Sequence, residues 1–163
     1  MKIFFYPLII LALFYTCSAQ TTNNNYICKK EVNELWRELA DSGRYHDAIN
    51  ILLDSIQTSK QKNINVTYWH VGQLYACNNE YDFAIKYIKK STGFFEKLFD
   101  REWRLYYYGT IAFLKKDKQK LKICNDKLWN KHSDYYYSNA CKLKALYENF
   151  DKPYKFVYDM ACK

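Results

Sequence analysis

Glycine and proline are scarce in this sequence, which has 4 glycines and 2 prolines among 163 residues. Because these two residues form most of the tight turns between β-strands, their scarcity argues against an all-β fold. No stretch alternates apolar and polar residues for long, so the usual pattern of half-buried strands is missing as well. The sequence therefore predicts an all-α protein, and its length predicts one domain.

Motifs that carry chemistry are also missing. No two cysteines have the C-x-x-C spacing of zinc sites and thioredoxin-like redox centres. His46, His70 and His132 form no pair with ligand spacing, and no serine or cysteine has a suitable base nearby in the sequence. We therefore predict a protein that is not an enzyme, with no catalytic residue, no metal site and no cofactor, although distant residues could still converge in the fold.

The long apolar run near the start, residues 3–15, is shorter than the roughly 20 residues that a membrane-spanning helix needs. It follows the positive charge of Lys2 and precedes Cys17-Ser18-Ala19, small residues of the kind that signal peptidase recognises. This is the pattern of a signal peptide. We expect cleavage after Ala19, a mature chain that starts at Gln20 without a stable membrane span, and export to the periplasm, the cell surface or the medium.

Cys17 supports a second interpretation, in which the protein is a lipoprotein anchored through this residue. Phe14 and Thr16 fit poorly the small and aliphatic residues that a lipoprotein site usually has. If the signal is removed, five cysteines remain, at positions 28, 77, 124, 141 and 162. In an oxidising compartment cysteines pair, so an odd number leaves one thiol free or shared with another chain. Alternatively, they are small buried core residues.

Positive charge is concentrated in the second half of the chain. Residues 20–100 contain ten basic and ten acidic side chains, whereas residues 101–163 contain fourteen basic and seven acidic ones. The basic half favours acidic partners, anionic glycans or a membrane surface. We expect no nucleic-acid partner, because an exported chain does not normally meet nucleic acid.

Residues 65–91 predict two amphipathic helices joined by the polar turn Asn78-Asn79-Glu80. Apolar residues recur every three or four positions on each side of the turn, so each helix has one stripe to bury. The stripes are Tyr68, Val71, Gly72 and Tyr75 before the turn, and Tyr81, Ala84, Ile85 and Ile88 after it. Gly72 and Ala84 stand where the two helix axes would approach most closely, as in a packed helical hairpin.

The same pattern occurs earlier in the chain. Gly43-x-Tyr45-x-x-Ala48 aligns with Asn79-x-Tyr81-x-x-Ala84 at a period of 36 residues, which indicates stacked helical units. Both units resemble the tetratricopeptide repeat, a 34-residue helix-turn-helix unit. The matching positions are Val32, Leu35, Trp36, Leu39, Gly43, Tyr45, Ala48, Leu52 and Ser55 in the first unit, and Tyr68, Val71, Gly72, Tyr75, Asn79, Tyr81, Ala84, Ile88 and Ser91 in the second.

Two later units match less well. Leu105, Gly109 and Ala112 fit the first helix of a third unit, but Lys118 and Leu121 stand where an aromatic residue and alanine are expected. Periodicity predicts a fourth hairpin with a break at residues 149–153. The resemblance implies a right-handed superhelix of about four hairpins, at about 29–62, 65–98, 102–131 and 133–163. Residues 20–28 before them are expected to be a disordered spacer, because this polar stretch has nothing to bury.

The resemblance also implies a concave groove lined by the first helix of each unit, a surface that binds peptides or proteins in this family. The inward positions are Asn33, Arg37, Trp69, Gln73, Cys77, Trp103, Tyr106, Thr110, Tyr135, Asn139 and Lys142. Their aromatic rings offer contact area, and their amides can pair with a peptide backbone. The alternative is that some of these rings only pack against the facing helix.

In such a stack the second helix of the third unit packs on the first helix of the fourth. These helices carry Cys124 and Cys141, which makes this pair the candidate disulfide. For function, the resemblance favours a scaffold that binds a peptide or protein, with an acidic partner suited to the basic half. The alternative is an inhibitor or immunity-type protein that neutralises a secreted toxin or hydrolase. A third interpretation is a purely structural unit of a larger assembly.

Overall fold

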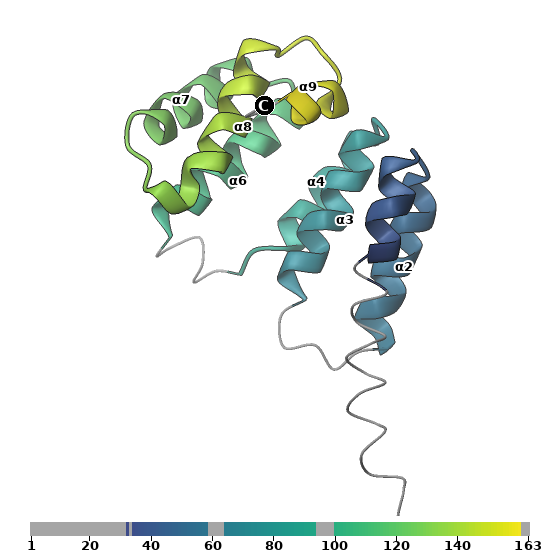
Figure 1. Ribbon diagram of the computed structural model, residues 1–163. Helices are drawn as coiled ribbons and strands as arrows, with labels where there is room; N and C mark the ends of the chain where they lie inside the picture. The colour runs from purple at the N-terminus through teal and green to yellow at the C-terminus, as the bar shows by residue number, and fades with distance from the viewer. Residues whose placement is uncertain (1–31, 33, 59–63, 94–99, 161–163) are drawn as a thin grey trace, which may run out of the picture.

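A computed structural model describes residues 32, 34–58, 64–93 and 100–160, and Figure 1 shows their arrangement. Within these ranges the chain is helical without any strand, which confirms the prediction of an all-α fold. The expected signal peptide and spacer, residues 1–28, lie outside the described residues. A helical segment at 34–41 is followed by α2 (Tyr45–Thr58), α3 (Asn65–Cys77), α4 (Tyr81–Lys90), α6 (Arg101–Leu114), α7 (Lys118–Trp129), the 3-10 helix η1 (Asp134–Tyr136), α8 (Tyr137–Glu148) and α9 (Tyr154–Met160).

Helices that follow one another along the chain pack against one another. Contacts join α2 to α3, α3 to α4, α4 to α6, α6 to α7, α7 to α8 and α8 to α9. In Figure 1, α3 and α4 lie between α2 on one side and the group of α6, α7, α8 and α9 on the other. This serial arrangement agrees with helical hairpins arranged one after another. None of the described helices is both long enough and apolar enough to cross a membrane.

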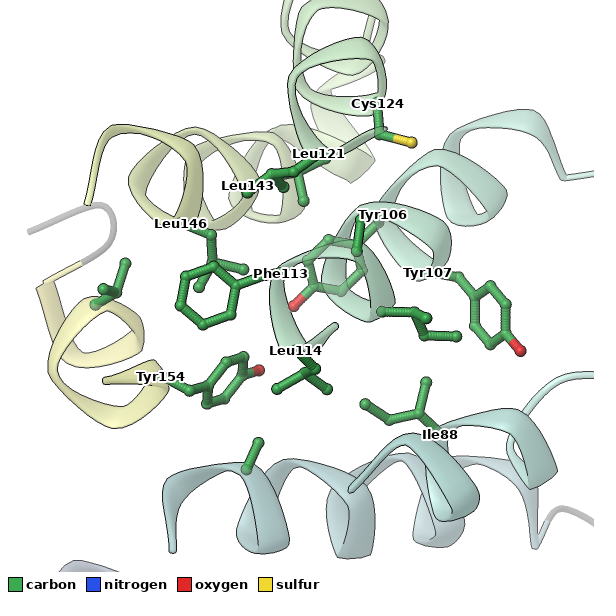
Figure 2. Close-up of a cluster of buried hydrophobic side chains, with 14 of the residues drawn as sticks. Ile88, Tyr106, Tyr107, Phe113, Leu114, Leu121, Cys124, Leu143, Leu146 and Tyr154 are labelled. Atoms are coloured by element: carbon green, nitrogen blue, oxygen red, sulfur yellow. The ribbon is translucent and has the colours of Figure 1, made fainter. Parts of the chain in front are cut away.

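The apolar core has two parts, and α3 contributes to both. Val71 and Leu74 of α3 pack with Trp36 and with residues of α2 such as Ile49. The opposite side of α3 packs into the larger part, which is built mainly from α6, α7, α8 and α9. Figure 2 shows this second part, where Leu121, Leu143, Leu146 and Tyr154 surround Phe113. Because both faces of α3 are buried, this helix connects the two parts of the core.

The approach of α3 to α4 depends on a residue without a side chain. A Cβ atom added at Gly72 would lie 2.6 Å from Cγ1 of Ile88, 3.0 Å from its backbone nitrogen and 3.1 Å from the carbonyl oxygen of Ala84. These distances show that α3 and α4 are in close contact at Gly72 and Ala84. Gly109, 37 residues later, allows a different close contact: an added Cβ there would lie 2.5 Å from Cδ1 of Leu143 on α8 and 3.2 Å from the Cβ atom of Cys124 on α7.

In three hairpins, the turn that follows the first helix has the same local backbone conformation. Positive φ occurs, within the described ranges, at Gly43 (79°), Asn79 (62°) and Lys116 (60°). At each turn the next backbone N–H donates to the carbonyl five residues earlier, a hydrogen bond that closes a helix C-terminus in the Schellman manner. The three bonds are Arg44 to Leu39 (2.8 Å), Glu80 to Tyr75 (2.9 Å) and Asp117 to Ala112 (2.8 Å). The period of 36 residues therefore corresponds to a repeated turn conformation. The third turn, at Lys116, has the same conformation.

Gly43 allows a direct test of this turn. An added Cβ at Gly43 would meet nothing within 4 Å, so only the backbone conformation opposes a side chain there. We expect Gly43→Ala to lower the free energy of unfolding by about 1 kcal/mol, because left-handed φ disfavours residues other than glycine and asparagine. Gly43→Asn, which copies Asn79, should cost clearly less. Urea unfolding followed by circular dichroism compares the two variants, and an equal cost would contradict this explanation.

Candidate functional site

The described residues of the predicted groove have different surroundings. Asn33 is outside the described residues. Arg37 is exposed on the helical segment 34–41, where its guanidinium carbon lies 4.4 Å from the centre of the Trp36 ring. Asn139, on α8, does not line the pocket described below. The remaining positions fall into two groups, one beneath α9 and one beside η1.

Helix α9 covers the first group. It packs against α3 as well as against α8. The Gln73 side-chain nitrogen donates a hydrogen bond of 2.8 Å to the Tyr158 hydroxyl, and the Lys142 ammonium lies 3.6 Å from the centre of the Tyr158 ring. Tyr106 is also buried here, and burial and the neighbouring Tyr158 raise its pKa well above the usual value. Gln73, Tyr106 and Lys142 thus contact a helix of the same chain in this structure.

Two further residues of the predicted groove, Cys77 and Thr110, lie within the packed helices. Cys77, at the end of α3, is partly buried, and this burial, with Asp159 of α9 nearby, raises the pKa of its thiol to about 11. The thiol therefore stays protonated near neutral pH, where the thiolate is the nucleophile. Thr110 is fully buried and donates its hydroxyl hydrogen to the carbonyl of Tyr106 (2.9 Å). Both residues therefore contribute to packing here.

The second group includes Trp69 of α3 and Trp103 of α6, whose rings contact each other and the ring of Tyr106 from the first group. The Trp69 and Trp103 ring centres lie 4.7 Å apart, and the Tyr106 ring centre lies 5.4 Å from that of Trp69 and 5.9 Å from that of Trp103. Rings at these separations and tilted to each other attract through their edges and faces. Trp69 and Tyr106 are buried, while Trp103 keeps part of its surface exposed.

Beside these rings lies a cavity of about 340 Å³, which we call the aromatic pocket. It opens where the N-terminal ends of α3 and α6 meet η1. Its lining residues are Asn65, Val66, Trp69, Ser91, Asp100, Trp103, Tyr135 and Tyr136. Three of the predicted groove residues, Trp69, Trp103 and Tyr135, therefore converge on one cavity, although they come from three different elements.

A network of polar contacts holds η1 at the start of α6. Asp100 caps α6 by accepting a hydrogen bond of 2.9 Å from the Trp103 backbone N–H, and it also accepts one from the Tyr136 hydroxyl. Glu102 accepts two bonds from Ser133, one of 3.0 Å from its backbone N–H and one of 2.6 Å from its hydroxyl. These contacts fix the Tyr136 ring and the start of η1 beside the pocket, which places Tyr135, the residue before Tyr136, at the mouth.

The wall of the pocket is fixed, whereas one ring at its mouth is open to solvent. The Trp103 indole N–H donates to the Thr92 hydroxyl (3.3 Å), which fixes the ring plane. Tyr135 is 84% exposed, and its ring contacts that of Tyr136 edge-on at 4.9 Å. A large exposed aromatic ring beside a cavity is available for contact with a ligand.

Several pocket residues were not expected from the sequence. Asn65, Val66, Ser91, Asp100 and Tyr136 were not assigned to the groove, because the resemblance points only to inward positions of first helices. Asp100 carries a recognisable signal, since aspartate just before a helix is a common N-cap. Tyr136 carries none, because it belongs to a single 3-10 turn without periodicity.

The predicted disulfide between Cys124 and Cys141 is wrong for this structure. Cys124 is a buried free thiol. It lies on the side of α7 that faces α6, since its Cβ would be 3.2 Å from a Cβ added at Gly109. The helices that carry the two cysteines, α7 and α8, do pack against each other as expected. Cys124, however, points toward α6, and so it does not pair with Cys141.

The histidines take part in packing and polar contacts. The pKa of His70 is lowered mainly by burial, and its Nδ1 lies 3.1 Å from the Gln73 side-chain oxygen. His46 forms an exposed pair with Glu80, with 2.8 Å between Nε2 and the carboxylate. In the part of the chain that the structure describes, no group of three or more His, Cys, Asp or Glu side chains is placed to hold a metal ion.

Comparison with known proteins provides no relative for this chain. No protein-family model, no curated protein and no solved structure matches it.

Proposed function

We propose that this chain is a non-enzymatic scaffold of the tetratricopeptide type, which binds a peptide or protein outside the cytoplasm. The observation that carries the proposal is the aromatic pocket. A cavity of about 340 Å³ falls in the size range of ligand sites, and its mouth presents the exposed ring of Tyr135. Aromatic side chains of this kind are enriched among the residues that dominate binding energy at protein interfaces.

The repeated architecture supports the choice of a scaffold. The turns at Gly43, Asn79 and Lys116 share one backbone conformation at intervals of 36 and 37 residues. Gly72 and Gly109, at the second and third units, both permit close helix contacts. Stacks of helical hairpins commonly present binding surfaces formed by several units, and the pocket receives rings from two units and from η1. The expected groove is shortened here, because α9 covers the part around Gln73.

The proposal of export rests on the pattern of residues 1–19, a positive charge followed by an apolar run and small residues. The family resemblance favours a protein or peptide as the partner. The net charge of +8 favours a partner whose own net charge is negative. No metal or cofactor is required for binding of this kind.

Selection from a library of random linear peptides tests the proposed function. Peptides selected on the purified protein should bind the Tyr135→Ala variant at least about 5-fold more weakly, because loss of a central aromatic contact typically costs more than 1 kcal/mol. Tyr137→Ala is the matched control, since Tyr137 is 53% exposed, lies two residues further on and does not line the pocket. Selection of no peptide, or equal binding to both variants, would contradict a peptide site at the pocket.

A further inference from the structure

We propose that the aromatic pocket recognises an alkylammonium group, such as the side chain of a lysine or methylated lysine on the bound polypeptide. This inference rests on the proposed function, because it names the chemical group that the pocket would select from a partner. The lining combines four aromatic rings, those of Trp69, Trp103, Tyr135 and Tyr136, with one carboxylate, that of Asp100.

The rings supply the first part of the argument. The face of an indole or phenol ring carries partial negative charge, so a cation within about 6 Å of the ring centre is attracted to it. Tryptophan gives the strongest attraction, and two of the four rings are tryptophans. Several rings around one cavity form the arrangement that proteins use for quaternary ammonium groups.

Asp100 supplies the second part. Its carboxylate lines the pocket and accepts hydrogen bonds from the Trp103 backbone N–H and the Tyr136 hydroxyl. A carboxylate offers about four acceptor positions, so these two bonds leave part of its accepting capacity unused. The pKa of Tyr136 is raised, first by burial and then by its bond to Asp100 and by the negative charges of Asp100 and Glu102. The same two charges would stabilise a cation placed beside the Tyr136 ring.

One feature opposes a cation. The first turn of α3, with Asn65 and Val66, also lines the pocket, and a helix N-terminus carries a partial positive charge of roughly half a unit. Asp100 caps α6 and so also meets the dipole of that helix, but Glu102 adds a second full negative charge beside Tyr136, and together the two carboxylates outweigh both helix N-termini. We therefore expect a weak but selective cation site, with the ring faces giving much of the attraction.

The volume fits this class of ligand. About 340 Å³ exceeds the space needed by a trimethylammonium group, so the pocket can also take part of the chain that carries it. Because the pocket is open at Tyr135, a lysine side chain could enter while its own backbone stays at the surface.

Tryptophan fluorescence gives a direct assay, because two of the protein's four tryptophans line the pocket. We would titrate the purified protein with choline and with 3,3-dimethylbutan-1-ol, its uncharged analogue of nearly the same shape. Choline should bind at least about 5-fold more tightly than the neutral analogue. A short peptide with one trimethyllysine tests the polypeptide source, and it should bind at least as tightly as choline.

Three variants locate the site. Tyr135→Ala should weaken choline binding by about 2-fold to 30-fold, the effect expected for one cation–ring contact. Tyr137→Ala, its exposed neighbour outside the pocket, should leave binding unchanged. Asp100→Asn keeps a side chain that can cap α6 but removes the charge, so it should reduce the preference for choline over the neutral analogue.

Equal binding of choline and its neutral analogue would overturn the inference, as would a choline response that Tyr135→Ala leaves unchanged. If peptides are selected at the pocket but the pocket binds choline no more tightly than the neutral analogue, the proposed function stands and the cation inference fails. If choline binds as expected but no peptide can be selected, the peptide-binding function fails and the cation site stands. Tighter binding of choline than of the trimethyllysine peptide would overturn the assignment to a polypeptide side chain.

Discussion

Replacing Phe113 by alanine should lower the free energy of unfolding by about 3–5 kcal/mol. Phe113 is fully buried in α6. Its ring contacts Phe150 edge-on, with 5.8 Å between the ring centres, and lies 6.0 Å from the ring of Tyr154. The side chain therefore links α6 to the segment that leads into α9, and its removal leaves a cavity that the surrounding leucines cannot fill without shifting (Figure 2).

The matched control for Phe113→Ala is Phe156→Ala. Phe156 is 49% exposed, so the same truncation there should cost about 1 kcal/mol or less. Urea unfolding followed by far-ultraviolet circular dichroism measures both. A domain of this size is stable by only about 5–15 kcal/mol, so the first variant should unfold at clearly lower urea concentration. Equal midpoints for the two variants would show that Phe113 is not a central core residue.

Gly72→Val should lower the free energy of unfolding by about 3 kcal/mol, at the upper end of the usual cost of overpacking. The added Cβ would overlap Ile88, which is fully buried, and two of the three nearest atoms belong to the backbone of α4. A backbone obstacle cannot be avoided by a rotamer change, so α3 and α4 must separate. The two γ-methyl groups of valine increase the overlap further.

A graded series separates overlap from helix propensity. Gly72→Ala adds the Cβ alone and gains up to about 1 kcal/mol of helix propensity, so its net cost should be smaller than that of valine. Ser138→Val, at an exposed position of α8, is the control without any close approach, and it should change stability little because serine and valine have similar helix propensities. If Gly72→Ala stabilised the protein by the full propensity difference, the contact between α3 and α4 would be looser than described. Thermal unfolding monitored by circular dichroism gives all three values.

The hairpin pattern was predictable because local signals agreed. At residues 65–91 the apolar period of each helix, the polar turn and the two small residues all indicated one arrangement, and the structure has it. The third unit lacked the expected residues at Lys118 and Leu121, yet Leu121 is fully buried in the larger part of the core. Helix packing needs a buried apolar residue at this position, and leucine meets that need when the neighbouring helices allow its volume.

Other features were not predictable from local signals. The surface that α9 covers depends on the direction of the chain after residues 149–153. Hydrophobic periodicity does not determine this direction. Gln73 and Lys142 were assigned to an open groove because their positions face inward in the family pattern, but Tyr158 contacts both. In the aromatic pocket three of the four rings follow from the pattern, whereas Tyr136 belongs to a short 3-10 turn without periodicity and Asp100 lies before a helix rather than on one. Such contacts between distant segments require three-dimensional information.

The contact between α9 and α3 has a consequence for cooperativity. In a linear array whose units touch only their neighbours, stability is a sum of local terms, and an end unit can unfold alone. Here the Gln73 to Tyr158 bond joins residues 85 positions apart and bypasses the units between them. Loss of α9 would therefore uncover a side chain of α3, near the middle of the chain. The segment from α3 to α9 is thus closed on itself, and partial opening at its end is coupled to the packing of its beginning.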